Sequence, residues 1–566
     1  MKSGSKLLKV AALTVVAALL TAGCARLPQG GQLKVGPDIQ GGLASDYIYY
    51  SPAGPTAGAL QSEIVNGFIT AGTGPQNDYA TAREFLTEDL KSVWSPNDEV
   101  LIQRSKGNLN IVDEKNISFT FALAATVSAD GQYSASSASQ TTDASRTLDF
   151  ELVQERGQWR ISKAPNLTVL IRPVFEVIFK SYSVYFYDHQ RRYLVPELRW
   201  FPSRASTGTR LVNAVLDGPS DWLSPGVETA VPSGTELALD AVTIELGVAV
   251  VDLTSQALKA NELQRQLLKA QLTATLEQLS TVSSIEIRID HAPQEIADFN
   301  VAQPPAASYT PVALTSTKLF HVSPDAQTEV SGSRAIVQAL SPYDFVLSSD
   351  ERRLALLNYS GLHLATLNQV AGGSTLADSR TGLLSPSFDR QGYLWSLTAQ
   401  GPAAFLAVSN DGSKINVADA WLSSKTRLQF ALSPEGSRIA ILVAGLDSNR
   451  LEVASIIRGK QGQPIGISQP MTIAAEVQNP QTVSWVDSLT LAVLGKEGAD
   501  ASRTPYFVTV GGSVGKIGVL SDAKELVASN TASSIYALAN AGKLYRYQGF
   551  NWLMQADGVS AIHFTH

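Results

Sequence analysis

Residues 61–178 carry two hydrophobic patterns, one typical of helix and one typical of strand. Ile64 and Phe68 are spaced by one helical turn, so this segment is predicted to open with a helix. Further on, apolar residues alternate with polar ones, as in a strand with one buried face: Leu148, Phe150 and Leu152. Gly157 then turns the chain into a second strand around Trp159–Ile161. Helices followed by an antiparallel sheet predict a small α+β domain.

Residues 179–300 contain the same mixture in a different order. The apolar strand 184–187 comes first, and a short helix containing Leu211 and Val215 follows. A longer helix is predicted over residues 261–279, because leucines recur along one of its sides. Strands precede and follow this helix, which predicts a second α+β domain with a mixed sheet.

Helical periodicity largely disappears after Pro304 and Pro305, which mark a linker predicted over residues 301–318. From residue 319 to 566, short apolar strands recur between turn signals such as Ser433–Gly436, at a spacing of about 40 to 50 residues. This period predicts a β-propeller, an all-β fold of radial blades, with five clear blades and a total of five to seven. The predicted fold class is therefore multidomain, with two small α+β domains followed by a propeller.

The first 23 residues have the pattern of an export signal. An uncharged apolar core, Val10–Leu20, follows three lysines: Lys2, Lys6 and Lys9. This core is shorter than the roughly 20 apolar residues that a spanning helix needs. Small residues stand directly before Cys24, which predicts cleavage there and lipidation of the Cys24 sulfur; a soluble secreted protein is the alternative. Residues 24–60 are rich in glycine and proline and are predicted to be a flexible tether.

Composition excludes several classes of protein. Cys24 is the only cysteine among 566 residues, so the exported part can form neither an intramolecular disulfide nor a thiolate metal site. The net charge is -7, with 17% charged residues, and no block of lysine or arginine stands out beyond the signal. This charge pattern argues against nucleic-acid binding. Without its signal the chain is still too long for one core, in agreement with several domains.

Motifs for catalysis and metal binding are weak. Gly511–Gly515 fits the Gly-x-Ser-x-Gly nucleophile elbow around Ser513, but strand-like residues follow where the elbow needs a helix, so a hairpin turn is predicted. His563 and His566 have the spacing of metal ligands, but we expect them to be surface residues of a frayed C-terminal strand. The sequence therefore predicts no catalytic residue, no cofactor site and no metal site.

Three aromatic residues of the second domain allow two interpretations. They form either a surface for glycan or a partner, or packing in the core and under loops: Tyr193, Trp200 and Trp222. Packing is favoured, because Gly218–Ser220 reads as a helix stop that Trp222 would cover.

The most specific stretches of the chain are Tyr193–Pro202 and Leu216–Pro225. Residues 64–94 and the lipobox-like Thr21–Cys24 add to them, although Thr21 stands where a lipobox prefers leucine. Together these segments resemble the actinobacterial LpqB lipoprotein family, whose members carry an N-terminal domain, a sporulation-germination-type GerMN domain and a degenerate C-terminal propeller. The resemblance covers essentially the whole chain.

The resemblance implies a GerMN-like fold for residues 179–300 and a non-enzymatic accessory protein of the cell envelope. Such a protein is anchored in membrane lipid through Cys24, as a diacylglyceryl and palmitate-bearing lipoprotein, on the extracytoplasmic face of the cell membrane. It binds the extracytoplasmic domain of a sensor histidine kinase of the Mtr two-component type, modulates that kinase and thereby influences cell-envelope homeostasis and division. The alternative is a lipoprotein that binds peptidoglycan or another envelope glycan, or a structural scaffold.

Overall fold

The computed structural model describes residues 52–136, 145–204, 206–304, 310–323, 327–367, 373–402, 404–496, 503–529 and 531–565. These residues all belong to one compact unit. The predicted signal peptide, Cys24, most of the tether and His566 lie outside them. None of the helices formed by the described residues is long and apolar enough to cross a membrane.

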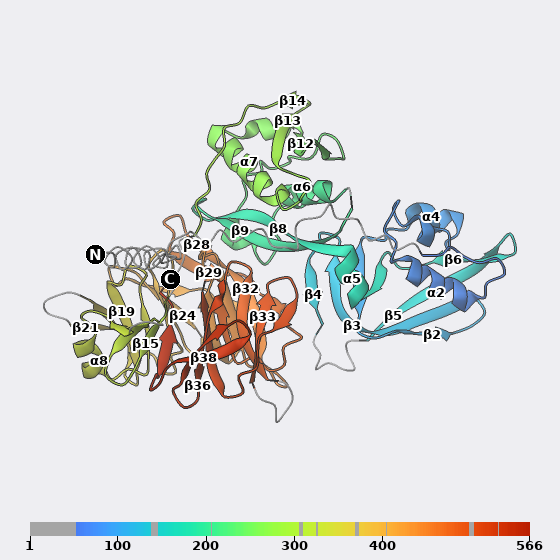
Figure 1. Cartoon of the computed structure of the whole chain (residues 1–566). Helices are drawn as coiled ribbons and strands as arrows, with labels where there is room; N and C mark the ends of the chain where they lie inside the picture. Colours follow the sequence, from blue (N-terminus) through green and yellow to red (C-terminus); the bar gives the residue numbers. More distant parts are fainter. Residues whose placement is uncertain are drawn as a thin grey trace, which may run out of the picture. The chain divides into compact units, whose positions relative to one another are not determined.

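The first domain is a seven-stranded sheet with short helices against it (Figure 1). Five strands follow the order β6-β5-β3-β1-β7, and β2 and β4 also pair with β3. The strands are β1 Glu99–Gln103, β2 Asn108–Ile111, β3 Asn116–Ser128, β4 Tyr133–Ala135, β5 Ser145–Glu155, β6 Gln158–Lys163 and β7 Thr168–Ile171. The helices are α2 Gln61–Ala71, α3 Ala80–Arg83, α4 Glu88–Val93 and α5 Arg172–Ile178.

The apolar positions predicted from the sequence form the core of this domain. Ile64 and Phe68 lie on the buried side of α2, and Phe150 lies on the buried side of β5. The Phe68 ring centre is 5.0 Å from that of Trp94 and 6.0 Å from that of Phe150. The helical period of α2 and the alternating period of β5 therefore bring their apolar faces together.

The second domain has two small sheets and two main helices. One sheet contains β8 Phe179–Asp188, β9 Leu194–Pro202 and β10 Val227–Glu228, and the other β11 Thr243–Glu245, β12 Val248–Leu253, β13 Ser284–Ile289 and β14 Ala292–Pro293. The helices are α6 Thr207–Asp217 and α7 Glu262–Leu276, with 3-10 turns η1 Ser224–Gly226 and η2 Ser255–Lys259. In Figure 1, α6 and α7 lie between the two sheets. The second sheet is mixed, as predicted, because β12 pairs antiparallel with β11 and parallel with β13.

Six sheets of the propeller type follow in the described part of the last domain. The first contains β15 Val312–Leu314, β16 Leu319–Val322, β17 Gln327–Glu329 and β39 Ala561–His563. The second and third contain β18 Asp344–Leu347, β19 Arg353–Asn358, β20 Gly361–Thr366 and β21 Ser374–Asp378, then β22 Ser387–Phe388, β23 Leu394–Leu397, β24 Phe405–Val408 and β25 Lys414–Val417. Helix α8 Arg334–Leu340 connects the first sheet to the second, and the 3-10 turn η3 Ala420–Leu422 follows the third.

The fourth sheet contains β26 Arg427–Leu432, β27 Arg438–Val443, β28 Arg450–Arg458, β29 Pro464–Ile467 and β30 Met471–Ile473. The fifth contains β31 Thr482–Trp485, β32 Thr490–Lys496, β33 Arg503–Thr509 and β34 Val514–Lys516, and the sixth β35 Ala523–Ser529, β36 Thr531–Ala539, β37 Leu544–Gln548 and β38 Asn551–Ala556. Each sheet is one blade, so the described residues form six blades, within the predicted range of five to seven.

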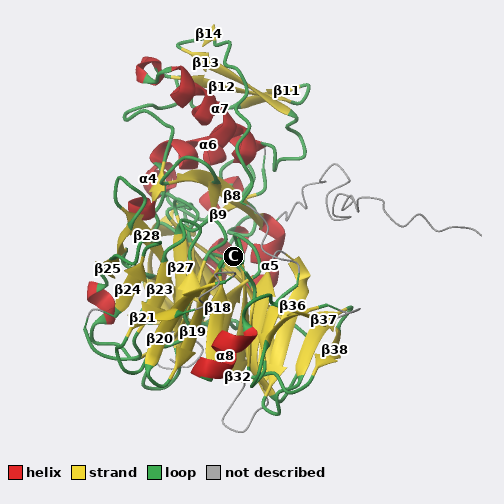
Figure 2. Cartoon of the chain, turned by 90° about the vertical axis from the view of Figure 1, so that its left-hand side faces the viewer, coloured by secondary structure: helices red, strands yellow, loops and turns green. Residues whose placement is uncertain are grey.

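The C-terminal strand closes the propeller. β39 pairs with β15, so the first blade is built from both ends of the domain, and the C-terminal end lies beside β18 in Figure 2. β15 falls within the segment 301–318 that the sequence predicts as a linker, because a three-residue strand is too short to show a period. The prediction of a frayed C-terminal strand is wrong, since Ile562 is 0% exposed.

Closure by β39 makes Ile562 a core residue although it lies four positions from the C-terminus. We expect Ile562→Ala to lower the free energy of unfolding by about 2–5 kcal/mol, because it leaves a cavity between packed strands. Leu446→Ala is the matched control, because Leu446 is fully exposed in the same propeller and its loss should cost less than about 0.5 kcal/mol. Urea unfolding measures both; equal, small effects would mean that the terminal strand is frayed.

Candidate functional site

The β8–β9 hairpin contacts both neighbouring domains. The Trp200 indole Nε1 of β9 donates to the Gly511 carbonyl of the propeller, at 2.9 Å. The Arg438 guanidinium of β27 donates to the Pro196 carbonyl, at 3.1 Å. Gly512 allows the close approach, because a Cβ at that position would lie 2.9 Å from Leu198 Cδ2. The specific stretch Tyr193–Pro202 is thus a joint between domains.

A buried charge network holds the other side of β9. Arg199 and Glu197 are 2% and 4% exposed, and their side chains are 2.8 Å apart. Arg199 also donates to the Asp130 carboxylate and carbonyl of the first domain, at 2.9 and 2.8 Å. The Ser220 hydroxyl and backbone N–H donate to the Glu197 carboxylate. Because buried charges must be paired, this network fixes the first domain on the second.

The second specific stretch, Leu216–Pro225, lies against the propeller. The Ser468 hydroxyl donates to the Trp222 carbonyl, at 2.6 Å. At the neighbouring Gly226, a Cβ would lie 2.6 Å from the Cβ of Ser455, so only glycine permits this contact. Both stretches that carry the family resemblance therefore lie where domains meet.

The three aromatic residues of the second domain follow the packing interpretation. Trp222 is 8% exposed. The Trp200 ring centre is 5.0 Å from that of Phe175 and 5.8 Å from that of Tyr133, both in the first domain. Tyr193 is partly buried, with the Arg192 guanidinium over its ring. Trp200 and Trp222 therefore pack between domains, whereas Tyr193 is partly buried next to Arg192.

Ser513 lies in a hairpin turn, as the sequence predicts. β33 and β34 pair antiparallel on either side of it, and no helix follows where a nucleophile elbow requires one. The Ser513 carbonyl accepts from the Thr509 N–H at 3.0 Å, which closes the turn. This geometry gives Ser513 no resemblance to a nucleophile.

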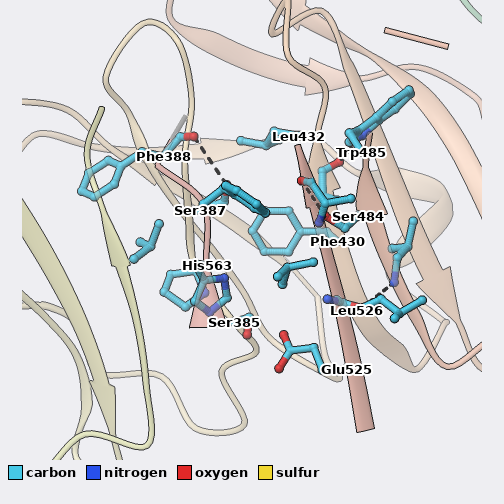
Figure 3. Close-up of a pocket in the computed structure, with 18 of the residues that line it drawn as sticks. Ser385, Ser387, Phe388, Phe430, Leu432, Ser484, Trp485, Glu525, Leu526 and His563 are labelled. Carbon is cyan, nitrogen blue, oxygen red and sulfur yellow. Dashed lines mark hydrogen bonds between the residues drawn. The ribbon is translucent and has the colours of Figure 1, made fainter. Parts of the chain in front are cut away.

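The propeller contains an axial cavity of about 70 Å³. Residues from the inner strands β18, β22, β26, β31 and β35 and the C-terminal segment line it, and Figure 3 shows them converging. Its polar lining residues come from five blades: Ser385 and Ser387 from one, and Gln429, Ser484, Glu525 and His563 from one each. A pocket with a few convergent polar groups is the usual form of a ligand site.

One ion pair in the cavity joins the closing strand to the second blade. His563 Nε2 of β39 is 2.7 Å from Asp344 Oδ1 of β18, and the Ser385 hydroxyl donates to the other oxygen of Asp344. Burial, the largest single cause, opposes charge on Asp344, but the His563 imidazolium and the hydrogen bonds from Ser385 and the Phe345 N–H together lower the pKa of this carboxyl. Burial is also the largest single cause for His563 and opposes its charge, but the charge and hydrogen bond of Asp344 together with the charge of Glu525 raise the pKa of His563. The prediction of a surface histidine is therefore wrong.

Glu525 of β35 carries the one carboxyl among the described residues that line the cavity. Burial raises its pKa from 4.5 to about 7, Asp344 adds to this rise and His563 reduces it. The described residues hold no group of three or more histidine, cysteine, aspartate or glutamate side chains that could bind a metal ion. Sequence reasoning missed Asp344, Ser385 and Glu525, because no local motif joins residues from different blades. The sequence offered one sign that His563 belongs to an inner blade strand: the apolar pair Ala561–Ile562 stands directly before it.

Three family models match the chain. The model of the Lipoprotein LpqB N-terminal domain matches residues 54–176, that of sporulation and spore germination (Germane) residues 183–295, and that of the Lipoprotein LpqB beta-propeller domain residues 318–562. Among solved structures, the first GerMN domain of the sporulation protein GerM from Bacillus subtilis is similar, with 20% identity, 22% of this chain and 96% of that chain covered, and a TM-score of 0.19.

Curated relatives match over nearly the full length. Lipoprotein LpqB of Thermobifida fusca is 25% identical over 88% of this chain and 89% of its own, and Lipoprotein LpqB of Cutibacterium acnes is 24% identical over 98% of each. Fold and matches define the class: a membrane-associated lipoprotein with two α+β domains and a β-propeller. The chain belongs to the LpqB lipoprotein family.

The buried network at β9 predicts a large effect of Arg199→Met. The substitution leaves the Glu197 carboxylate buried without its guanidinium partner, which should lower the free energy of unfolding by roughly 3–5 kcal/mol. Glu197→Gln added to Arg199→Met should recover part of this loss, because it removes the unpaired charge. Lys163→Met is the control, since both side chains of the Lys163–Glu151 pair are at least 50% exposed and such solvent-screened pairs contribute little to stability. An equal cost for both substitutions, measured in urea, would contradict the buried network.

The raised pKa of Glu525 predicts a pH-dependent stability. The folded chain keeps this proton up to about pH 7, whereas the unfolded chain releases it near the ordinary pKa of 4.5. The stability contribution is therefore full below that value and is lost as pH rises, by about 1 kcal/mol per pH unit between about pH 5 and pH 6. Glu525→Gln should remove this slope, as measured by urea unfolding at both pH values.

Between pH 5 and pH 6, the effect of Glu525 on the free energy of unfolding is distinct from the effects of His563 and Asp344. The raised pKa of His563 gives a contribution that is lost only above its unfolded pKa of 6.5. The lowered pKa of Asp344 gives a contribution that is lost only as pH falls below 3.8. A slope that persists unchanged in Glu525→Gln would show that another group causes it.

Proposed function

We propose that this chain is anchored through lipid on Cys24 at the extracytoplasmic face of the cell membrane, where it binds and modulates a sensor histidine kinase of the Mtr two-component type. Through that kinase it influences cell-envelope homeostasis and division. Membership of the LpqB lipoprotein family supports this proposal. The structural observation that supports it most is the joint at β9, which connects all three domains so that they can bind a partner as one unit.

The anchor and the joint have complementary physical effects. Two or more acyl chains hold a protein stably on a membrane, whereas one chain does not. A flexible tether of the length of residues 24–60 has an end-to-end distance of about 30–35 Å, which keeps the folded domains near a membrane-embedded partner. This confinement raises the effective concentration of the lipoprotein at the kinase. Because the three domains are joined at β9, binding of the kinase at one domain then also affects the other two.

The alternative function is binding of peptidoglycan or another envelope glycan, or a structural scaffold role. One observation favours glycan binding: the Tyr343 and Tyr359 rings are 5.3 Å apart, and Tyr359 is 99% exposed. Exposed aromatic rings combine an apolar face with a polar tip. Tyr359→Ala should weaken sedimentation of the chain with isolated peptidoglycan if this alternative holds, and should leave it unchanged if it does not.

The proposed function is tested with the kinase reconstituted in liposomes and the lipidated chain added on the side of the kinase's extracytoplasmic domain. We expect a dose-dependent change in kinase phosphorylation. Cys24→Ser should require a concentration at least about tenfold higher for the same change, because it loses confinement to the membrane but keeps the binding surface. Folded chain that leaves phosphorylation unchanged at every dose would exclude kinase regulation and leave the alternative functions.

A further inference from the structure

The axial cavity is lined by a carboxyl that forms no hydrogen bond or ion pair with a described side chain. Asp344 is saturated, because His563, the Ser385 hydroxyl and the Phe345 N–H all contact it. Glu525, in contrast, has neither a hydrogen bond nor an ion pair among the described residues. Figure 3 shows its carboxylate in the same part of the pocket as His563 and Ser385. The fold therefore leaves one potential anion free within a confined space.

The cavity walls favour a cation over any other charged ligand. Glu525 and His563 are the only ionisable residues that line the described cavity, and His563 is committed to Asp344. Lys524, the neighbour of Glu525 on β35, has an exposed side chain and does not line the cavity. An anionic ligand would meet repulsion from Glu525 without a lysine or arginine to offset it.

The volume and the lining residues of the cavity further restrict the class of ligand that fits. A volume of about 70 Å³ holds several waters or the tip of a small organic group, but not a sugar ring with its substituents. The Phe430 ring borders the cavity and offers a face to a cation, while the Ser387 hydroxyl oxygen can accept a hydrogen bond. Among the described residues, no group of three or more histidine, cysteine, aspartate or glutamate side chains could hold a divalent metal at this cavity.

We propose that the axial cavity binds a primary ammonium group, with the Glu525 carboxylate as its counter-ion. Two sources share this chemistry: a small free amine, and the tip of a lysine side chain from a partner protein. The ammonium donates to Glu525, and the other polar groups that line the cavity accept from its remaining N–H groups. This site does not depend on kinase binding, so the two ideas stand or fall separately.

Protons compete with the ammonium for Glu525. The charged groups that act on this carboxyl are His563 on β39 and Asp344 on β18, together with Lys524, which points away from the cavity on β35 itself. Because the pKa of Glu525 is about 7, the carboxylate predominates at pH 8 and the neutral acid at pH 5.5. Ammonium binding therefore strengthens as pH rises through neutrality.

Calorimetric titration of the full-length chain in detergent with propylammonium chloride tests the site. We expect saturable binding at pH 8 that weakens about tenfold or more at pH 5.5 and in Glu525→Gln. Asp522→Asn is the matched control, since it removes a carboxylate from the same segment outside the cavity and should leave the affinity unchanged. 1-Propanol, which is neutral and of similar size, should not bind. The pH series on the unsubstituted chain remains decisive even if Glu525→Gln does not fold.

The source of the ammonium follows from a second titration. An end-blocked tripeptide with a central lysine is compared with its norleucine counterpart under the same conditions. Binding of propylammonium and the lysine peptide indicates a cavity open to free amines as well as side chains, and binding of the lysine peptide alone indicates a site for a partner's lysine. Absence of saturable binding by either, or equal affinity in Glu525→Gln, overturns the proposal.

Discussion

The arrangement of the domains depends on the ion pairs and hydrogen bonds of the buried Arg199 guanidinium. A charge that is almost fully removed from water is tolerated only with close partners, and Arg199 finds them in Glu197 on its own strand and Asp130 in the first domain. Glu197 in turn requires Ser220, which positions the turn after α6. The opposite face of the same strand contacts the propeller through Leu198 and Trp200. One strand thus sets the relation between three domains.

Propeller closure provides the second constraint, and it creates the axial cavity. Because the inner strand of the first blade comes from the C-terminus, His563 is carried to Asp344, which is 219 positions away in the sequence. Inner strands from successive blades then point side chains toward one axis, where burial changes their proton affinity. The structural ion pair satisfies Asp344 and leaves Glu525 free, so closure and the potential for binding arise from the same geometry.

The sequence predicts the architecture much better than the sites. Regular periods predicted the α2 helix around Phe68, the strand around Phe150 and the bladed domain, because each pattern lies within one element. The short strand β15 was not predicted, because three residues show no period. His563 was predicted on the surface, because its partner Asp344 belongs to another blade. Arg199 and Glu197 stand in a recognisable stretch, but their burial depends on Asp130, which local pattern cannot reveal.

The contacts at β9 hold the first domain and the propeller in one fixed relation. Pulsed electron-resonance distance measurement tests it most directly, with spin labels on Ile111→Cys and Leu446→Cys in a Cys24→Ser chain, since both labelled positions are exposed. We predict a single narrow distance distribution that broadens when Arg199→Met is added. A distribution that is already broad or multimodal before Arg199 is changed would show that the contacts at β9 do not fix the two domains.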